Sequence, residues 1–303
     1  MNKTVRIPSI NDSSEGYRSL VKLDLEIHRI VSDFFISKND ILTMSFNFES
    51  CLILKQNGVS YLGAISYWLK EKGVKLYYQV RSLVPDVFKT LSEDGFLGSN
   101  FERYHKKVSV DAKHIQFNHF SGDDENRKVT NKIQMYITDE WLAKANIHFS
   151  NRLKQDITVR LYELFANALE HSNSEIGCVA NGQSTQNDID LCVVDLGRGI
   201  ADNVKKFCAE RNELVSSSQA VGKAFMSGFT TRNDNSGGLG LALIKDFLQL
   251  NKGSLDVYCN DVHLKIDPAE SEPIIATTEE SFQGTILNVK LQKDGQYYSY
   301  RNE

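Results

Sequence analysis

The sequence predicts an α/β protein with two domains, for three reasons. Its 303 residues are twice the ~150 residues of a typical domain. The first half alternates segments with strand and helix periodicity, which indicates a small layered α/β domain. The second half differs, because a long amphipathic helix is followed by apolar strands and two glycine-rich segments. We expect the first domain at residues 1–140 and the second at residues 141–303.

Composition and charge exclude several classes of protein. Hydrophobic residues make up 41% and charged residues 24% of the chain, as in ordinary soluble globular proteins. The 35 basic and 39 acidic residues give a net charge of −4, so no nucleic-acid partner is indicated, because phosphate contacts need a basic excess. The longest largely apolar stretch, 59–69, is shorter than the ~18 residues of a membrane span, and residues 1–9 lack the apolar core of a signal peptide. We therefore expect a cytoplasmic protein that does not enter a membrane.

The first domain is predicted to alternate strands and helices. Residues 41–48 alternate apolar and polar side chains, as a strand does, and 74–80 form a second strand rich in Tyr and Val. Helices are predicted at 59–72, which carries apolar residues on one face, and at 84–92, which has a proline in its first turn. The polar run 121–128 is expected to be an exposed loop.

The second domain is predicted to begin with a long amphipathic helix at 152–172. An apolar strand at 189–195 follows, and it ends on an aspartate. A helix at 241–250 and strands at 254–258 and 285–291 complete the domain. Between the last two strands, residues 260–281 are expected to be irregular, and the residues after 293 are expected to form a loosely held tail.

Glu163 and Asn167 are the first candidate site residues, on the long helix. A spacing of four places the carboxylate and the carboxamide on the same helix face, one turn apart. An amide oxygen is a suitable ligand for Mg²⁺, and a nearby carboxylate can orient or deprotonate a water molecule. Taken alone, the pair is more typical of the solvent-exposed side of a helix than of a ligand site.

Asp195, Gly197 and Gly199 form the second candidate segment. An acidic residue at the end of a buried strand can accept a hydrogen bond from a ligand's amino group. The two glycines would let the backbone approach a flat ring closely. An ordinary turn at a strand end has the same pattern, and both interpretations stay open for this segment alone.

A glycine loop at 236–240 that opens directly into a helix is the third segment. Free backbone N–H groups and the positive end of the helix dipole make such a junction a phosphate site. The loop lacks the Gly-Lys-Ser/Thr ending of a Walker A loop. The fourth segment is Gly284-Thr285 at the start of the last strand. The threonine hydroxyl there could reach the same edge of the ligand's flat ring as Asp195.

In this order and at these separations, the four segments resemble the GHKL superfamily of ATP-binding domains (HATPase_c, the Bergerat fold). This superfamily includes histidine kinases, gyrase B, Hsp90, MutL and the anti-sigma-factor serine kinases. The match covers residues 150–292. It consists of LYELFANALEHS at 161–172 for the N box, DLGRGI at 195–200 for the G1 box, GGLGLALIK at 237–245 for the G2 box, and Gly284-Thr285 for the last box.

The resemblance implies a fold and a role for each motif. The fold would be an α/β sandwich in which helices cover one face of a mixed sheet, with ATP between the helices and a flexible lid. Asn167 would coordinate a Mg²⁺ ion that bridges the phosphates, and Glu163 would be the general base. Asp195 would accept a hydrogen bond from the adenine amino group, and Thr285 would assist through water. The other residues implied to contact the nucleotide are His171, Gly197, Gly199, Gly237, Gly238, Leu239 and Gly240.

The lid is implied at residues 220–232. Thr230, Thr231 and Arg232 are the candidates to touch the γ-phosphate. The chain departs from the family pattern at Ser236, where a full Gly-x-Gly-x-Gly motif would have glycine, and this leaves the lid geometry open.

The first domain resembles the STAS domain, the fold of anti-sigma-factor antagonists. The strand at 41–48, KQNGV at 55–59 and KEKGVKLYY at 70–78 follow the STAS layout. In that family a serine usually precedes the glycine and receives phosphate, whereas this chain has Asn57. The resemblance therefore implies a regulatory domain that is not switched at the usual residue.

Three activities stay open at this point. The first is a slow Mg²⁺-dependent ATPase that acts as a nucleotide-dependent switch in signalling or regulation. The second is a serine/threonine kinase of the anti-sigma-factor type that acts on a separate protein, and the third is a non-catalytic ATP sensor. Histidine autokinase activity is disfavoured, because none of the seven histidines is followed by Asp or Glu. A regulatory protein partner is expected, and a homodimer is compatible with the family.

Overall fold

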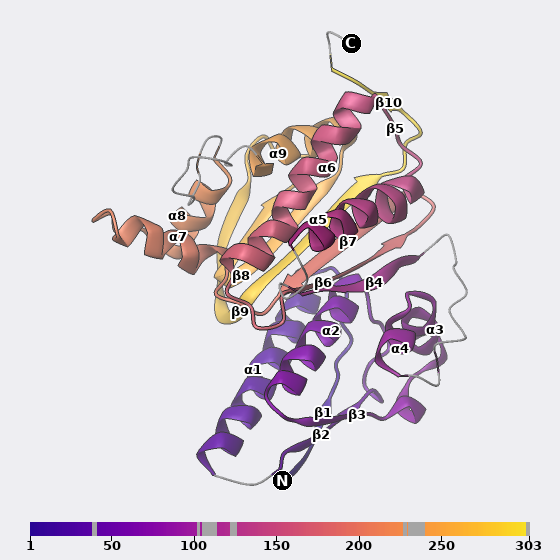
Figure 1. Cartoon of the computed structure of the whole chain (residues 1–303), viewed down its shortest axis with the longest axis vertical. Coiled ribbons are helices and arrows are strands. Elements are labelled where there is room, and N and C mark those ends of the chain that lie inside the picture. The colour runs from indigo at the N-terminus through magenta and orange to yellow at the C-terminus, as the bar shows by residue number, and fades with distance from the viewer. Residues whose placement is uncertain are drawn as a thin grey trace.

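Two β-sheets and the helices between and around them organise the chain (Figure 1). The computed structural model describes residues 1–37, 41–101, 104, 114–121, 126–226, 229 and 240–300, with the backbone alone at 126–127 and 240–243. It confirms the α/β fold class.

The N-terminal part of the chain forms a three-stranded parallel sheet in the order β1-β2-β3. Ser13 starts the first helix, because its hydroxyl accepts the Gly16 N–H at 3.2 Å. Pro85 occupies the first turn of α3, where its fixed φ suits a helix start. The elements are β1 (Asn2–Arg6), α1 (Ser14–Ile36), β2 (Thr43–Asn47), α2 (Gln56–Glu71), β3 (Lys75–Tyr78), the 3-10 turn η1 (Val80–Ser82), α3 (Pro85–Glu93) and α4 (Phe96–Asn100).

The second sheet has five strands in the order β4-β6-β7-β9-β8. Each neighbouring pair in it runs antiparallel, a difference from the mixed sheet that the family resemblance implies. Hairpin connections between β6 and β7 and between β8 and β9 explain this direction. The strands are β4 (His114–Phe120), β6 (Cys178–Ser184), β7 (Asp188–Asp195), β8 (Ser254–Ile266) and β9 (Ile274–Gln292).

One face of this sheet is covered by helices from the C-terminal part of the chain (Figure 1). Their apolar side chains form a core with β4, β6, β7, β8 and β9. Two short helices, α7 and α8, pack together beside the sheet with a small apolar cluster of their own. These helices are α5 (Asn126–Met135), the π-helix η3 (Tyr136–Trp141), the 3-10 turn η4 (Leu142–Lys144), α6 (Asn151–Ala166), the π-turn η5 (Asn167–His171), α7 (Ile200–Ala209), α8 (Ser217–Ala224) and α9 (Gly240–Asn251).

The opposite face of the sheet is covered by α1 and α2, so that helices lie on both faces (Figure 1). The ring of Tyr17 from α1 stacks on Tyr258 of β8 with the centroids 3.9 Å apart. Side chains of α1 and α2 and of β6, β7 and β9 belong to one continuous apolar core. The N-terminal sheet and the five-stranded sheet are therefore joined by packing as well as by the chain.

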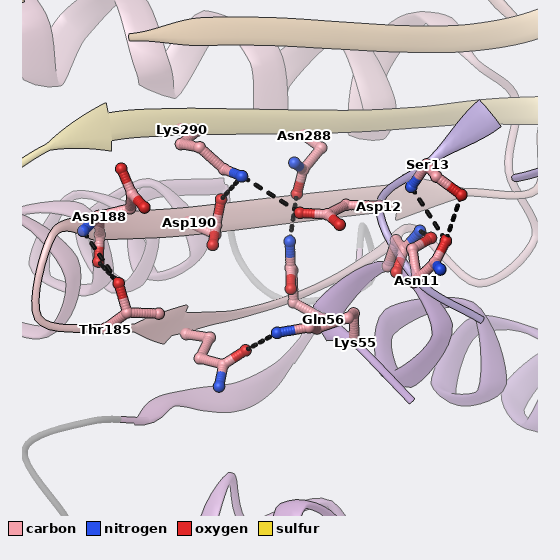
Figure 2. A network of polar contacts seen from close by, with 12 residues as sticks. Asn11, Asp12, Ser13, Lys55, Gln56, Thr185, Asp188, Asp190, Asn288 and Lys290 are labelled. Atoms are coloured by element: carbon pink, nitrogen blue, oxygen red, sulfur yellow. Dashed lines mark hydrogen bonds and ion pairs between the residues drawn. The ribbon is translucent and has the colours of Figure 1, made fainter. Parts of the chain in front are cut away.

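Polar contacts also join the N-terminal part of the chain to the five-stranded sheet, beside the apolar core (Figure 2). Gln56 Nε2 at the start of α2 donates to Asn288 Oδ1 of β9 at 3.2 Å. Lys290 Nζ, also on β9, lies 3.1 Å from Asp12 Oδ2 and 3.7 Å from Asp190 Oδ1 of β7. These pairs offset part of the cost of removing polar groups from water, while Gln56 Oε1 and Asp190 Oδ1 are buried without a hydrogen bond.

Three segments differ from what the sequence patterns indicate. The five-stranded sheet begins with β4, before the boundary expected at residue 140, because the side chains of β4 and α5 pack into the second core. Residues 260–281, expected to be irregular, extend β8 and β9 as a hairpin. The expected loose tail after 293 contains β10 (Tyr297–Tyr298), which pairs with β5 (His148–Phe149).

None of the helices in the described part of the chain is both long and apolar enough to cross a membrane.

Gly63 on α2 provides a test of the close packing between α2 and the five-stranded sheet. A Cβ atom there would lie 2.3 Å from Phe117 Cε2 and 3.2 Å from Val179 Cγ1. Because both partners are buried, we expect Gly63→Ala to lower the free energy of unfolding by about 1–3 kcal/mol in urea titrations. Gly222→Ala on α8 is the control, since its Cβ would meet only Ile275 Cδ1, at 3.3 Å, and alanine favours helix. Equal unfolding midpoints for both variants would contradict the close approach of α2 to the sheet.

Candidate functional site

The helix α6 carries the first two predicted site residues and changes its geometry between them. The Ser150 hydroxyl caps its start by accepting the Leu153 N–H at 3.2 Å. The α-helix ends at Ala166, and the π-turn η5 begins at Asn167. Ser172 closes this turn with its N–H bonded to the Asn167 carbonyl oxygen at 3.1 Å. Single π-turns of this kind occur frequently at functional sites, and this one starts at a predicted site residue.

Glu163 has a basic partner on its own helix. Arg160 Nη1 lies 3.2 Å from Glu163 Oε1, and a quarter of the Glu163 side chain is exposed. Asn167 is partly buried one turn further on. The carboxylate and the carboxamide are thus both accessible to a ligand.

His171 ends the π-turn and is also partly exposed. Its Nε2 atom lies 4.0 Å from Glu170 Oε2, its neighbour in the chain. It shares a turn with Asn167, as the sequence indicates, and its role as a nucleotide contact stays a prediction.

Asp195 is buried at the end of β7, with 3% of its surface exposed. Its Oδ1 accepts the Gly197 N–H at 2.9 Å, and Thr285 is its register partner on β9. Burial raises the pKa of the Asp195 carboxyl to about 7, although neighbouring donors on Gly197, Thr285 and Ser172 oppose the shift. The site therefore contains a buried carboxyl group with spare acceptor capacity.

Three glycines lie near Asp195 at positions where a side chain would collide with neighbouring atoms. A Cβ atom on Gly284 would lie 2.1 Å from the Asp195 carbonyl oxygen, and Gly284 has φ +122°. A Cβ on Gly197 would lie 2.3 Å from the Ser172 carbonyl oxygen. Gly199, with φ +81°, turns the chain from the strand into α7.

The structure brings three of the four predicted segments together. Asp195 and Thr285 are register partners in the pairing of β7 with β9. The N–H of Arg198, in the glycine turn, donates to the Ser172 carbonyl oxygen at 2.6 Å. The end of the helix that carries Asn167 is thereby fixed against the turn after Asp195.

The remaining segment, the glycine loop at 236–240, is described only at its end. Gly240 is the first residue of α9, which places a helix N-terminus after the glycine loop as expected. Of the expected lid, the structure describes residues 220–226 and 229. The predicted residues Thr230, Thr231, Arg232, Gly237, Gly238 and Leu239, together with Ser236, lie outside the described residues.

Three residues of this region were not singled out by the sequence patterns. Ser172 contacts Asp195, Arg160 pairs with Glu163, and Asn260 Nδ2 donates to the Arg198 carbonyl oxygen at 3.1 Å. Only the Arg160 pair has a local signal, the spacing of three on a helix. The other two contacts join residues that are distant in the chain.

The raised pKa of Asp195 makes a prediction about stability. Between pH 4 and 7 the folded protein keeps a proton that the unfolded chain has released, so the free energy of unfolding falls as pH rises. We expect wild type to lose roughly 1 kcal/mol per pH unit in this window relative to Asp195→Asn, with no further loss above pH 7. Burial also raises the pKa of Asp94 and Asp190 to about 7, so both add to the pH dependence of stability. The comparison with Asp195→Asn isolates the share of Asp195. Parallel pH profiles for the two proteins in urea titrations would show that Asp195 has an ordinary pKa.

Comparison with known proteins places this site in a family. The family of histidine kinase-, DNA gyrase B- and HSP90-like ATPases matches residues 153–295. Among solved structures, the catalytic domain of the histidine kinase ThkA, in a nucleotide-free form, is 15% identical, and the match covers 59% of this chain and 96% of that chain with a TM-score of 0.28. The topoisomerase IV ATP-binding domain of Francisella tularensis, in complex with a small-molecule inhibitor, is 13% identical, and the match covers 63% of this chain and 46% of that chain with a TM-score of 0.24.

Among curated proteins, no match was found. The match at residues 153–295 includes α6, Asp195 and Thr285. Residues 153–295 of this chain therefore form a histidine kinase-, DNA gyrase B- and HSP90-like ATPase domain, the GHKL type.

Proposed function

We propose that this domain binds ATP with Mg²⁺ and hydrolyses it slowly, as a nucleotide-dependent switch in signalling or regulation. The observation that carries the proposal is the buried carboxyl group of Asp195, which lies opposite Thr285 in the strand pair. The turn after Asp195 is joined, through the bond of the Arg198 N–H to the Ser172 carbonyl oxygen, to the turn that begins at Asn167. One enclosed acceptor for a base thus lies beside the helix end that would hold the metal and the phosphates.

Base recognition is assigned to Asp195. A carboxylate accepts hydrogen bonds only, and the amino group of adenine donates them. Gly197 and Gly199 would let the ring lie against the backbone, and Thr285 would contact the same edge through water. This arrangement supports a purine with an amino group at its sixth position.

The residues present fit a magnesium ion that is held mainly by phosphates. The described residues contain no group of three or more His, Cys, Asp and Glu side chains that could enclose a metal ion. Mg²⁺ commonly takes only one or two protein ligands and completes its shell with phosphates and water. Asn167 would supply its amide oxygen, and the ion would neutralise charge on the phosphates when bound.

The phosphates are assigned to the N-terminus of α9. Its first residue is Gly240, and the N–H groups of a first helical turn favour an anion. We propose that Gly237, Gly238 and Leu239 complete this site. In the same proposal Thr230, Thr231 and Arg232 approach the γ-phosphate, and His171 approaches the nucleotide from the π-turn.

Water activation is assigned to Glu163. A carboxylate one helical turn from Asn167 can orient a water molecule and accept its proton. The ion pair with Arg160, at 3.2 Å, limits the rotation of this carboxylate.

The N-terminal part, expected at residues 1–140, is proposed to be a STAS-like regulatory domain with a protein partner. Its own elements in the structure are β1 to α4, because β4 and α5 pack in the second core. Asn57, at the position where STAS domains carry the phosphorylated serine, is fully buried. Its Nδ2 donates to the Asn11 carbonyl oxygen at 2.8 Å, and its Oδ1 accepts the Gly58 N–H at 2.9 Å. An asparagine held in this way is no phosphate acceptor, so any kinase activity would act on a separate protein. A cytoplasmic location and a homodimer belong to the same proposal.

Asn167→Ala is expected to remove the Mg²⁺ dependence of ATP binding. Without the amide oxygen, affinity measured by calorimetry should fall by about tenfold or more in the presence of Mg²⁺. Asn151→Ala, at the exposed start of the same helix, is the control and should bind as wild type does. Unchanged affinity in Asn167→Ala would remove this residue from the metal site.

Glu163→Gln is expected to retain ATP binding and to lose hydrolysis. Phosphate release should fall by about 10²- to 10⁴-fold, the usual contribution of a general base. Glu175→Gln, an exposed glutamate paired with Lys72, is the matched control. If turnover is the same in Glu163→Gln as in wild type, another group activates the water molecule.

Incubation with γ-labelled ATP separates the three activities. Release of free labelled phosphate supports the ATPase, whereas label on an added protein supports the kinase. Bound ATP that stays intact supports the sensor. Failure of wild type to bind ATP at all would end the proposal.

A further inference from the structure

We infer that a cavity between α6, α9 and the C-terminal tail is a binding site for a small aromatic carboxylate. Neither Asn167 nor Asp195 lines this cavity, so it is a second site and not a part of the proposed nucleotide site. Its apolar walls, its size and two buried hydrogen-bond donors without partners support the inference.

The walls of the cavity come from elements that meet at one end of the five-stranded sheet (Figure 1). Ile157 of α6, Phe247 of α9 and Leu291 of β9 are buried apolar residues that line it. The tail closes the cavity with Tyr298 and Tyr300. The ring of Tyr298 packs on that of Phe247, with the centroids 5.8 Å apart. A flat apolar ligand would therefore find aliphatic and aromatic surface around it.

The size of the cavity fits one aromatic ring with a short substituent. Its volume is about 180 Å³, and apolar cavities of about 150 Å³ accept benzene. Leu250, near the end of α9, lines the cavity and has 71% of its surface exposed. A ligand can thus approach the cavity from solvent at this end of α9.

Two of the lining side chains have a buried donor with no hydrogen-bond partner. One is Nε1 of Trp141, which is fully buried, and the other is Nε of Arg160. Leaving a buried donor unpaired costs free energy, which an acceptor on a ligand would recover. The structure describes all the lining residues, and none of them has a buried acceptor in the same condition. The ligand must therefore bring acceptors.

The charges at the cavity favour a carboxylate as the acceptor group. The planar guanidinium of Arg160 matches a carboxylate, which can accept two parallel hydrogen bonds from it. Arg152 adds a second positive charge nearby, over the ring of Tyr300 at 5.2 Å. Of the two lining aspartates, Asp156 already accepts the Tyr300 O–H at 2.6 Å, and Asp246 is exposed to water.

Arg160 also connects the cavity to the proposed nucleotide site. Its Nη1 lies 3.2 Å from Glu163 Oε1, so a carboxylate in the cavity would compete with Glu163 for the guanidinium. This consequence rests on the proposed function, because Glu163 is assigned to water activation. A bound aromatic carboxylate should lower kcat for phosphate release severalfold and leave KM for ATP unchanged.

The first experiment compares three probes with wild type by calorimetry, without nucleotide. Phenylacetate has a ring and a carboxylate, phenylacetamide has the ring without the charge, and acetate has the carboxylate without the ring. Phenylacetate should bind at concentrations up to about 10 mM, the range for so small a ligand. Phenylacetamide should bind about tenfold more weakly, the scale of a hydrogen bond to a charged group, and acetate should show no binding.

The second experiment locates the bound probe by fluorescence. The chain has two tryptophans, Trp68 and Trp141, and only Trp141 lines the cavity. Phenylacetate should change the emission of the Trp68→Phe protein, in which Trp141 is the sole tryptophan. Trp141→Phe is the matched control, and its emission, from Trp68 on α2, should not change.

The third experiment removes the guanidinium. Arg160→Met keeps an unbranched apolar side chain, and it should bind phenylacetate about tenfold more weakly, with the affinity that phenylacetamide shows. Arg211→Met is the control, because Arg211 also packs on an aromatic ring, that of Phe207 at 3.6 Å, but lies outside the cavity. This variant should bind phenylacetate as wild type does.

Several results would overturn the inference. Wild type could fail to bind phenylacetate, or it could bind all three probes equally, and neither result needs a variant that folds. The emission of Trp141 could stay constant with phenylacetate bound, or Arg211→Met could lose as much affinity as Arg160→Met. Binding of phenylacetate with unchanged kcat would overturn the link to Glu163 alone. Absence of ATP turnover in wild type would overturn the proposed function, and the binding experiments would still decide the cavity site.

Discussion

The antiparallel pairing of β7 with β9 is the constraint on which the rest of the structure depends. Eight register pairs join the two strands, from Asp188 opposite Gln292 to Asp195 opposite Thr285. Both strands are central in the five-stranded sheet, so their side chains enter the cores on both faces. A slip of one residue would exchange the two faces and move Asp195 out of its site. The same pairing thus fixes the cores and the position of the carboxyl group.

The two ends of this strand pair have different chemistry. At one end Asp195 faces hydroxyl and N–H donors, with no ion pair to it described. Further along the same strand, Asp190 lies beside Lys290, which also contacts Asp12 at the start of the N-terminal helix (Figure 2). Burial raises the pKa of both aspartates. An ion pair can hold two parts of a protein together, as the one between Asp12 and Lys290 does here. A carboxyl group whose neighbours are uncharged donors can still accept a hydrogen bond from a ligand.

The sequence predicts those parts of the fold and site that have local patterns. The helix with Glu163 and Asn167 and the apolar strand that ends at Asp195 follow from periodicity and position alone. The contact of Ser172 with Asp195 could not be predicted in this way, because strands β6 and β7 separate the two residues in the chain. The hairpin over 260–281, expected to be irregular, is defined by cross-strand pairing between segments that no local pattern joins. The cover that α1 and α2 form over the second face likewise depends on contacts between distant segments.

The position of α2 against the sheet has a consequence for how the chain unfolds. A sheet with one face stripped of its helices would present a broad apolar surface to water, which favours self-association. Residues of both sheets share one core, so melting either sheet withdraws support from the other. Heat should therefore denature the chain in a single cooperative step, with one calorimetric peak and equal van't Hoff and calorimetric enthalpies.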